Sequence, residues 1–332
     1  MDAGSHALAA EAAPIAVAAG PYVAPLMGAV EDLLTEVAAA TAPALAPHGA
    51  STIAAGGKRL RPLLVLVAAG GAPDDPAGLV RAAASVELVH SATLVHDDVL
   101  DGADLRRGQP TVVATAGPGM ATAAGDQLFA RAFTLLVANG RPDEVRVLSD
   151  AGSALARGEL LQREDAWNAE VTLDRYLLRC ELKTARLFES ACTLGVMESP
   201  ATATDPRMLA PFGRDVGLAF QILDDVLDVQ GPAERTGKHR GTDLLDGTVT
   251  LPFILARERD PALRAIEPRT ITSAEQAEQV CDAIASTGAL AEAREQALAL
   301  VERARASLPD GLGRAQREAL ELVAHGVVAR YA

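Results

Sequence analysis

The sequence predicts an all-α protein, a large single-domain helical bundle. Helix-period patterns cover most of its 332 residues, and no segment alternates like a strand between hairpin turns. Hydrophobic residues make up 49% of the chain and charged residues only 22%, so the chain can bury a large core. No linker rich in Pro, Gly or Ser divides its middle. We therefore expect one helical domain over residues 21–332, preceded by a loose, Ala-rich arm over residues 1–20.

The expected helices are runs in which apolar residues recur every three to four positions between turn-forming residues. They span residues 23–41, 60–69, 79–101, 122–138, 143–161, 173–195, 207–229, 252–259, 274–286, 290–307 and 314–330. The helices at 79–101 and 207–229 are so rich in Ala, Leu and Val that we expect them to be buried.

Composition excludes several classes of partner. The net charge of -14 disfavours binding to nucleic acid or to an anionic membrane surface. No apolar run reaches membrane-spanning length, and the N-terminus lacks the basic region of a signal peptide, so stable membrane insertion is not expected. The odd number of cysteines, Cys180, Cys192 and Cys281, without metal-ligand spacing, indicates buried thiols in a reducing cytoplasm.

One acidic motif, Asp-Asp-Val-Leu-Asp, occurs twice without change, at residues 97–101 and 224–228. Each copy lies in an apolar helix, where residues three and four apart share a face. Carboxylates packed this closely repel one another and are costly to bury, so a cation is expected between them. Mg2+ fits, because it prefers oxygen ligands and lets substrate phosphates complete its shell. The alternative is two capped or surface acidic turns. The residues in question are His90, Thr93, Asp97, Asp98 and Asp101 in the first helix, and Gln221, Asp224, Asp225 and Asp228 in the second.

Basic residues occur where phosphates could be bound. Lys58 and Arg61 follow two glycines at the start of a helix, an arrangement that favours an anion site over a basic surface turn in so acidic a chain. Arg106 and Arg107 lie in the irregular segment after the first acidic motif, where adjacent arginines can contact separate phosphate groups. The alternative for them is a basic pair at the C-terminus of a helix.

Three further candidates would add donors to the same phosphates. His90 lies two helical turns before Asp97, although a helical His often makes only a local hydrogen bond. Lys183 and Thr184 offer an ammonium and a hydroxyl inside an apolar helix, although such lysines commonly reach solvent. Lys238 lies in a Gly-rich, charged segment at residues 231–247 that we interpret as a mobile flap, with a plain surface loop as the alternative.

Together these residues resemble the all-trans polyprenyl diphosphate synthases of the class I isoprenoid synthase family. The resemblance covers residues 56–252 and is carried by Gly-Gly-Lys-x-x-Arg, the two acidic motifs, Arg-Arg-Gly, Lys-Thr, Phe-Gln and Gly-Lys-x-x-Gly-x-Asp-Leu, in family order. It implies a central substrate cavity, a homodimer, and three Mg2+ ions held by Asp97, Asp101, Asp224 and Asp228. It assigns isopentenyl diphosphate to Lys58, Arg61, His90 and Arg107, and the allylic diphosphate to Arg106, Lys183, Thr184, Gln221 and Lys238. Asp98, Asp225 and Lys183 count among the catalytic residues.

Two departures from the family pattern concern the flap. This chain has Lys238-His239 where relatives often have Lys-Pro, and Val249 where they often have a basic residue before Thr-Leu-Pro. Neither changes an acidic residue.

The expected reaction follows from charge. Cations stabilise the allylic diphosphate as it leaves, the double bond of isopentenyl diphosphate attacks the resulting carbocation, and a proton is lost to the departed diphosphate. Below Asp97 the helix carries the small residues Ala92 and Thr93, where short-chain relatives typically have aromatic ones. We therefore expect a long product, hexaprenyl or longer, with a geranylgeranyl product as the alternative.

Two other functions share this fold. A terpene cyclase is disfavoured because only 3% of residues are aromatic, and aromatic side chains stabilise the carbocations inside cyclases. A catalytically silent subunit of a heteromeric synthase is the second alternative, and such a subunit would be expected to lose its acidic motifs.

Overall fold

A computed structural model describes residues 12–40, 45, 48–49, 52–53, 59–106, 108–201, 205–231 and 240–329. Helices dominate this part of the chain, which confirms the predicted all-α class. The chain divides into two compact units. Unit 1 comprises Met1–Gly152, Leu187–Gly213 and Ser307–Gly326, and unit 2 comprises Ser153–Arg186, Arg214–Ala306 and Val327–Ala332. The single domain expected over residues 21–332 stays a prediction.

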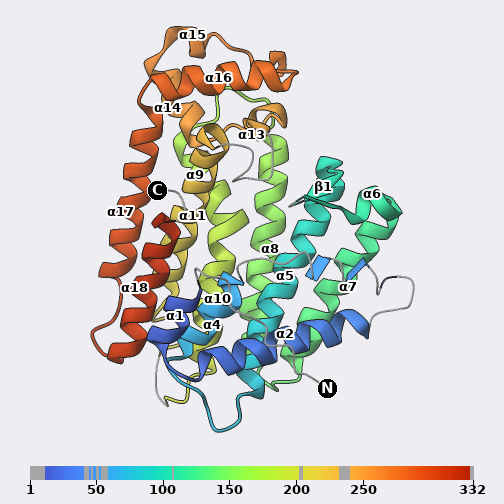
Figure 1. Ribbon diagram of the computed structural model, residues 1–332, viewed down its shortest axis with the longest axis vertical. Helices are drawn as coiled ribbons and strands as arrows, with labels where there is room; N and C mark the ends of the chain where they lie inside the picture. Colours follow the sequence, from blue (N-terminus) through green and yellow to red (C-terminus); the bar gives the residue numbers. More distant parts are fainter. Residues whose placement is uncertain are drawn as a thin grey trace. The chain divides into compact units, whose positions relative to one another are not determined.

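The core of unit 1 surrounds one long helix, α5 (Ala77–Asp101), which packs against α2 (Val23–Ala39), α4 (Leu60–Ala69) and α7 (Pro118–Val137). Figure 1 shows α5 running beside α7. Because neighbours cover several of its faces, α5 is apolar around most of its circumference. The helix ends at Gly102, whose φ of 59° is left-handed, and this ending places the first acidic motif in its last turns.

Other elements complete unit 1. They are α1 (Ala13–Ala19), a hairpin of β1 (Leu105–Arg106) and β2 (Gln109–Pro110), α6 (Val112–Ala116), and parts of α8 (Pro142–Glu164), α10 (Arg186–Met197) and α18 (Arg314–Ala329). Gly195 of α10 lies directly against the carbonyl of Val65 in α4, an approach that a Cβ would block.

Unit 2 carries the second acidic motif on α11 (Ala210–Gln230), most of which belongs to this unit. Its other helices are α9 (Leu173–Cys180), a π-helical turn η1 (Glu181–Ala185), α13 (Thr242–Leu245), α14 (Leu251–Arg259), α15 (Pro261–Arg264), η2 (Pro268–Thr270), α16 (Ala274–Ser286) and α17 (Ala289–Ala306). The almost fully buried α14 packs against α9, α15, α16 and α17, and so forms the centre of this part of the unit.

Several expectations need correction. Part of the loose arm expected over residues 1–20 is the helix α1, because Ile15, Ala16 and Ala19 bury one face of it. The helix expected over residues 173–195 is interrupted by η1, and the small β1–β2 hairpin and the short helices α6, α13 and α15 were not expected. The three cysteines are buried and form no disulfide, as predicted. Within the described ranges, no helix combines the length and apolar character needed to cross a bilayer.

Candidate active site

The first acidic motif lies at the C-terminal end of α5 in unit 1. Asp97 is half-buried and Asp101 is exposed, and the two lie on one face of the helix. Asp98 is buried, and its Oδ1 accepts a hydrogen bond from Nε of Arg106 at 2.7 Å. Arg106, predicted to bind the allylic diphosphate, therefore holds the β1–β2 hairpin against the acidic motif.

The residues predicted for isopentenyl diphosphate lie only partly within the described chain. Lys58 and Arg107 fall outside it. Arg61 is half-buried on the first turn of α4, with its guanidinium 4.7 Å from the centre of the Phe188 ring. His90 is half-buried on α5, where its carbonyl accepts a hydrogen bond from Thr93 at 2.8 Å. Because α4 packs against α5, Arg61 and His90 belong to neighbouring elements of unit 1.

The second acidic motif, on α11 in unit 2, buries its middle aspartate as the first motif does. Asp224 is exposed and Asp228 is half-buried, whereas Asp225 is buried. Asp225 accepts hydrogen bonds from the Tyr176 hydroxyl at 2.7 Å and from Nε2 of Gln221 at 2.8 Å. Burial and the nearby Asp243 raise the pKa of Asp225 to about 7, although its hydrogen bonds oppose this change. The middle carboxyl is thus fixed by protein groups.

The Lys-Thr pair lies in the π-helical turn η1, beside the second acidic motif in the same unit. Thr184 donates a hydrogen bond to Oε1 of Gln221 at 2.6 Å, which links this turn to Asp225 through the Gln221 amide. Nζ of Lys183 lies 2.5 Å from Oε2 of Glu159 and 3.2 Å from Oε1 of Gln162. Isolated π-helical turns inside α-helices are often found at functional sites.

Glu159 and Gln162, on α8, were not predicted as site residues, although their spacing of three positions puts them on one helix face. Burial would raise the pKa of Glu159, but Lys183 and Arg163 outweigh this effect and lower it. The carboxylate therefore stays charged and holds Lys183 in place.

The described end of the predicted flap is attached to the second acidic motif. The backbone N–H of Gly241 donates to the carbonyl of Asp228 at 3.0 Å, and that of Asp243 donates to Oδ2 of Asp228 at 3.3 Å. Val249, one of the two departures from the family pattern, accepts a hydrogen bond through its carbonyl from the buried Arg179 at 2.6 Å. Lys238 and His239 lie outside the described residues.

The chemistry of the donors suits a hard divalent cation. Asp97 and Asp101 in unit 1, and Asp224 and Asp228 in unit 2, offer carboxylate oxygens, the ligands that Mg2+ prefers. Among the described residues, no group of three or more His, Cys, Asp or Glu side chains is gathered into a metal site by itself. A cation bound through one or two carboxylates and substrate phosphates is compatible with this arrangement.

Comparison with known proteins decides the family. The model of the polyprenyl synthetase family matches residues 43–287. The chain belongs to the polyprenyl synthetase family. It is 40% identical over 247 residues to heptaprenyl diphosphate synthase component 2 of Geobacillus stearothermophilus, covering 74% of this chain and 77% of that protein.

Solved structures of family members have the same fold as this protein over nearly the whole chain. A decaprenyl diphosphate synthase from Rhodobacter capsulatus is 35% identical, with a TM-score of 0.85, covering 97% of this chain and 99% of that one. A polyprenyl synthase from Caulobacter crescentus CB15, solved with calcium and isoprenyl diphosphate, is 34% identical, with a TM-score of 0.86, covering 97% and 98%. These findings confirm the predicted isoprenoid synthase fold and the predicted enzyme class, a trans-prenyltransferase that elongates prenyl chains.

The family match includes each predicted site residue of this polyprenyl synthetase. Residues 43–287 contain both acidic motifs, the predicted basic residues, and the residues Ala92 and Thr93 predicted to set product length. Ala92 is fully buried and Thr93 is half-buried on α5, on the N-terminal side of Asp97. The individual roles of these residues stay predictions.

Proposed function

We propose that this protein condenses an allylic diphosphate with isopentenyl diphosphate, in a Mg2+-dependent reaction, to give a long all-trans polyprenyl diphosphate. The observation that carries the proposal is the repeated acidic motif, whose outer carboxylates are the more exposed ones in both copies. We further propose that the two motifs face each other across one substrate diphosphate. The agreement of the fold with solved polyprenyl synthases over 97% of the chain supports this arrangement.

The allylic diphosphate would be bound by Arg106, Lys183, Thr184, Gln221 and Lys238. Lys183 and Thr184 are already oriented by Glu159 and Gln221, so both side chains are held in place before substrate arrives. Asp97, Asp101, Asp224 and Asp228 would hold Mg2+, as many as three ions, and the bound metal would supply positive charge to offset that of the leaving diphosphate. The protein's cations stabilise the same leaving group.

Isopentenyl diphosphate would be bound by Lys58, Arg61, His90 and Arg107. These residues would hold its double bond next to the allylic carbocation, so that the new C–C bond forms head to tail. The carbocation that results loses a proton to the departed diphosphate. No side chain is assigned as a dedicated base. The apolar walls of the helices would exclude the water that would otherwise capture the cation.

We propose a long-chain product because Ala92 and Thr93 are small, and the decaprenyl synthase among the similar structures supports this length. A geranylgeranyl product is the alternative. We also propose a homodimer in the cytoplasm. These two properties stay predictions from the resemblance and from the buried thiols.

The test is incubation of the purified protein with Mg2+, isopentenyl diphosphate and farnesyl diphosphate, followed by mass analysis of the products. A ladder ending in one long polyprenyl diphosphate supports the proposal. A cyclic hydrocarbon would instead make the protein a terpene cyclase.

A second candidate is a subunit that is silent alone, favoured by the name of two relatives, component 2 of heptaprenyl diphosphate synthase. This candidate predicts no product from the purified chain. It also predicts that activity appears when a second component is added.

A further inference from the structure

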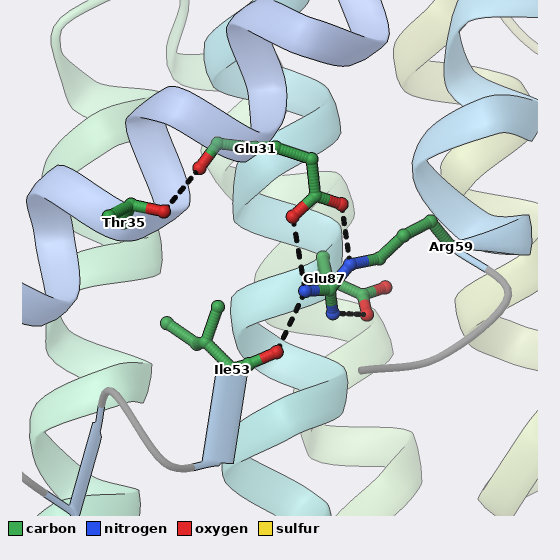
Figure 2. A network of polar contacts seen from close by, with 5 residues as sticks. All are labelled: Glu31, Thr35, Ile53, Arg59 and Glu87. Atoms are coloured by element: carbon green, nitrogen blue, oxygen red, sulfur yellow. Dashed lines mark hydrogen bonds and ion pairs between the residues drawn. The ribbon is translucent and has the colours of Figure 1, made fainter. Parts of the chain in front are cut away.

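A single arginine, Arg59, joins three segments of unit 1 at the start of α4 (Figure 2). Its Nε and Nη2 donate to the two carboxylate oxygens of Glu31 on α2, at 2.7 and 3.2 Å. Nη1 donates to Glu87 on α5 at 2.8 Å, and Nη2 also donates to the carbonyl of Ile53 at 2.9 Å. One planar guanidinium thus contacts two helices and the segment before α4.

This network is largely removed from solvent. The side chain of Arg59 is 12% exposed, that of Glu31 is 19% exposed and that of Glu87 is 5% exposed. Burial would lower the pKa of Arg59, but the Glu87 and Glu31 carboxylates outweigh this effect and raise it. Buried charges of this kind depend on each partner, because removing one leaves the others unpaired in a low dielectric.

The backbone of Arg59 adopts a conformation that the network must stabilise. Its φ of 47° and ψ of 35° are left-handed, which is uncommon for a residue other than glycine. The same residue is the N-cap of α4, and its carbonyl accepts the hydrogen bond from the N–H of Leu63 at 3.1 Å. The contacts that hold Arg59 therefore set the direction in which α4 begins.

The network also reaches the residues proposed to bind isopentenyl diphosphate. Arg59 is the neighbour of Lys58 in sequence and lies two positions before Arg61, on the first turn of α4. Glu87 lies three positions before His90, and so on the same side of α5. The Arg59 side chain therefore links the N-terminus of α4 to the part of α5 that carries His90.

We propose that Arg59 is a positioning residue for the isopentenyl diphosphate site, and that Glu31 on α2 takes part through it. Arg59 does not itself contact substrate. It fixes the start of α4 relative to α5, so that Arg61 and His90 present donors to one diphosphate. The role needs arginine, because lysine offers a single ammonium and cannot form the forked contact with Glu31 while also reaching Glu87. The proposal rests on the proposed function.

The test compares Arg59→Gly and Arg59→Lys with the wild-type protein in steady-state kinetics. Glycine tolerates the left-handed backbone, so Arg59→Gly removes the contacts without adding strain. We expect KM for isopentenyl diphosphate to rise about tenfold or more, while KM for the allylic primer changes by less than about twofold. Arg59→Lys should fall between Arg59→Gly and the wild type.

Two further variants keep the test falsifiable. Glu31→Gln leaves Arg59 and Glu87 paired, so it should fold and should raise the same KM by a smaller factor. The control Arg303→Lys alters another forked ion pair, that of Arg303 with Asp215 on α11 at 2.6 and 2.7 Å. It should lower the melting temperature without changing either KM.

The experiment distinguishes failure of the Arg59 proposal from failure of the proposed function. If the Arg59 and Glu31 variants only melt earlier, or if KM for both substrates rises together, Arg59 has a general structural role and the proposal is overturned. If the wild-type protein does not elongate, the proposed function fails instead. Calorimetric titration with isopentenyl diphosphate then tests Arg59 without turnover, and equal affinity of wild type and Arg59→Gly, or no binding by either, overturns the proposal.

Discussion

The two acidic motifs use their three aspartates in the same way. The middle residue of each, Asp98 or Asp225, is buried and bound by protein groups. The outer residues are half-buried or exposed. Helix geometry explains the division, because positions one and five of the motif share a face that position two does not. The outer carboxylates are therefore the ones proposed to bind a metal ion, and the middle ones orient neighbouring side chains.

This division predicts a ranking of aspartate variants. We expect Asp224→Asn to lower kcat by about 10² to 10³, since it removes charge that would hold the cation at the leaving group. Asp225→Asn should cost less, because the amide can still accept a hydrogen bond from Tyr176. The exposed Asp150→Asn on α8 is the control and should leave kcat unchanged. Equal losses for Asp224→Asn and Asp225→Asn would contradict the division.

Glu144, at the start of α8, is a fully buried carboxyl distant in sequence from the acidic motifs. Burial and a hydrogen bond with Glu198 raise its pKa from 4.5 to about 8, against the opposing effect of Asn139. The folded state therefore binds this proton more tightly than the unfolded state. Its contribution to stability is complete below about pH 4.5 and is lost as the pH rises through about 8.

The raised pKa of Glu144 should make the melting temperature depend on pH, and replacing Glu144 by Gln should reduce this dependence. Each unit of pKa difference corresponds to about 1.4 kcal/mol, so the loss can reach a few kcal/mol. Glu144→Gln cannot ionise, so its melting temperature should fall less than that of the wild type between about pH 5 and about pH 9. Asp143→Asn, an exposed neighbour, is the control. If the melting temperatures of wild type and Glu144→Gln fell equally with pH, the Glu144 carboxyl would not be protonated in the folded state.

At the scale of elements, the π-helical turn η1 places Lys183 and Thr184 against α8. A Cβ added at Gly158 would lie 2.5 Å from the backbone nitrogen of Lys183 and 2.8 Å from its Cα. The two helices therefore approach through their backbones at this point. Only a glycine permits this approach, and it brings Glu159 within reach of the Lys183 ammonium.

Two glycines on α8 provide a matched pair of substitutions. Gly158→Ala should lower the melting temperature by on the order of 5 °C and raise KM for the allylic primer, because η1 must shift to admit the methyl group. Gly152→Ala, whose Cβ would lie 3.8 Å from Phe129, should be neutral or stabilise by about 0.5–1 kcal/mol. If both variants bind the primer normally, η1 does not depend on the close approach.

Helices with strong apolar periodicity and clear end signals were predictable. The ranges of α4 and α16 agree with those expected, and α4 ends at Gly70, whose φ is 72°. The turn η1 was not predictable, because Glu-Leu-Lys-Thr-Ala has no local feature that disfavours an α-helix, and its close approach to Gly158 is a tertiary contact. The helix α1 was missed because an Ala-rich segment shows little contrast between its faces.

At the scale of the whole molecule, candidate site residues could be proposed from sequence where they form a motif, but not where they depend on a contact with a residue distant in sequence. The acidic motifs and the Lys-Thr pair were proposed from residue type and spacing, and their roles stay predictions. Glu159 and the link from Arg59 to Glu31 and Glu87 were missed, since the partners of Arg59 lie 28 residues away in either direction and form no local pattern. Such contacts arise only from tertiary packing.

Product length is also a property of the whole molecule, because it depends on how far the growing chain extends past Asp97. Ala92 is fully buried on α5, and we propose that the growing chain passes it, so that a larger side chain there would shorten this path. We expect Ala92→Leu to shorten the product and Ala92→Tyr to shorten it further, as measured by mass, with circular dichroism confirming that both fold. An unchanged product length in folded variants would refute the assignment.

The central claim is that both acidic motifs bind the same metal-bound diphosphate. The most direct measurement is a crystal structure with Mn2+ in place of Mg2+ and an unreactive allylic thiodiphosphate, with the metals located by anomalous scattering. We predict that oxygens of Asp97 or Asp101 and of Asp224 or Asp228 coordinate metals on one diphosphate. Metal ions confined to a single motif, with the other motif bound to no part of the diphosphate, would contradict the account.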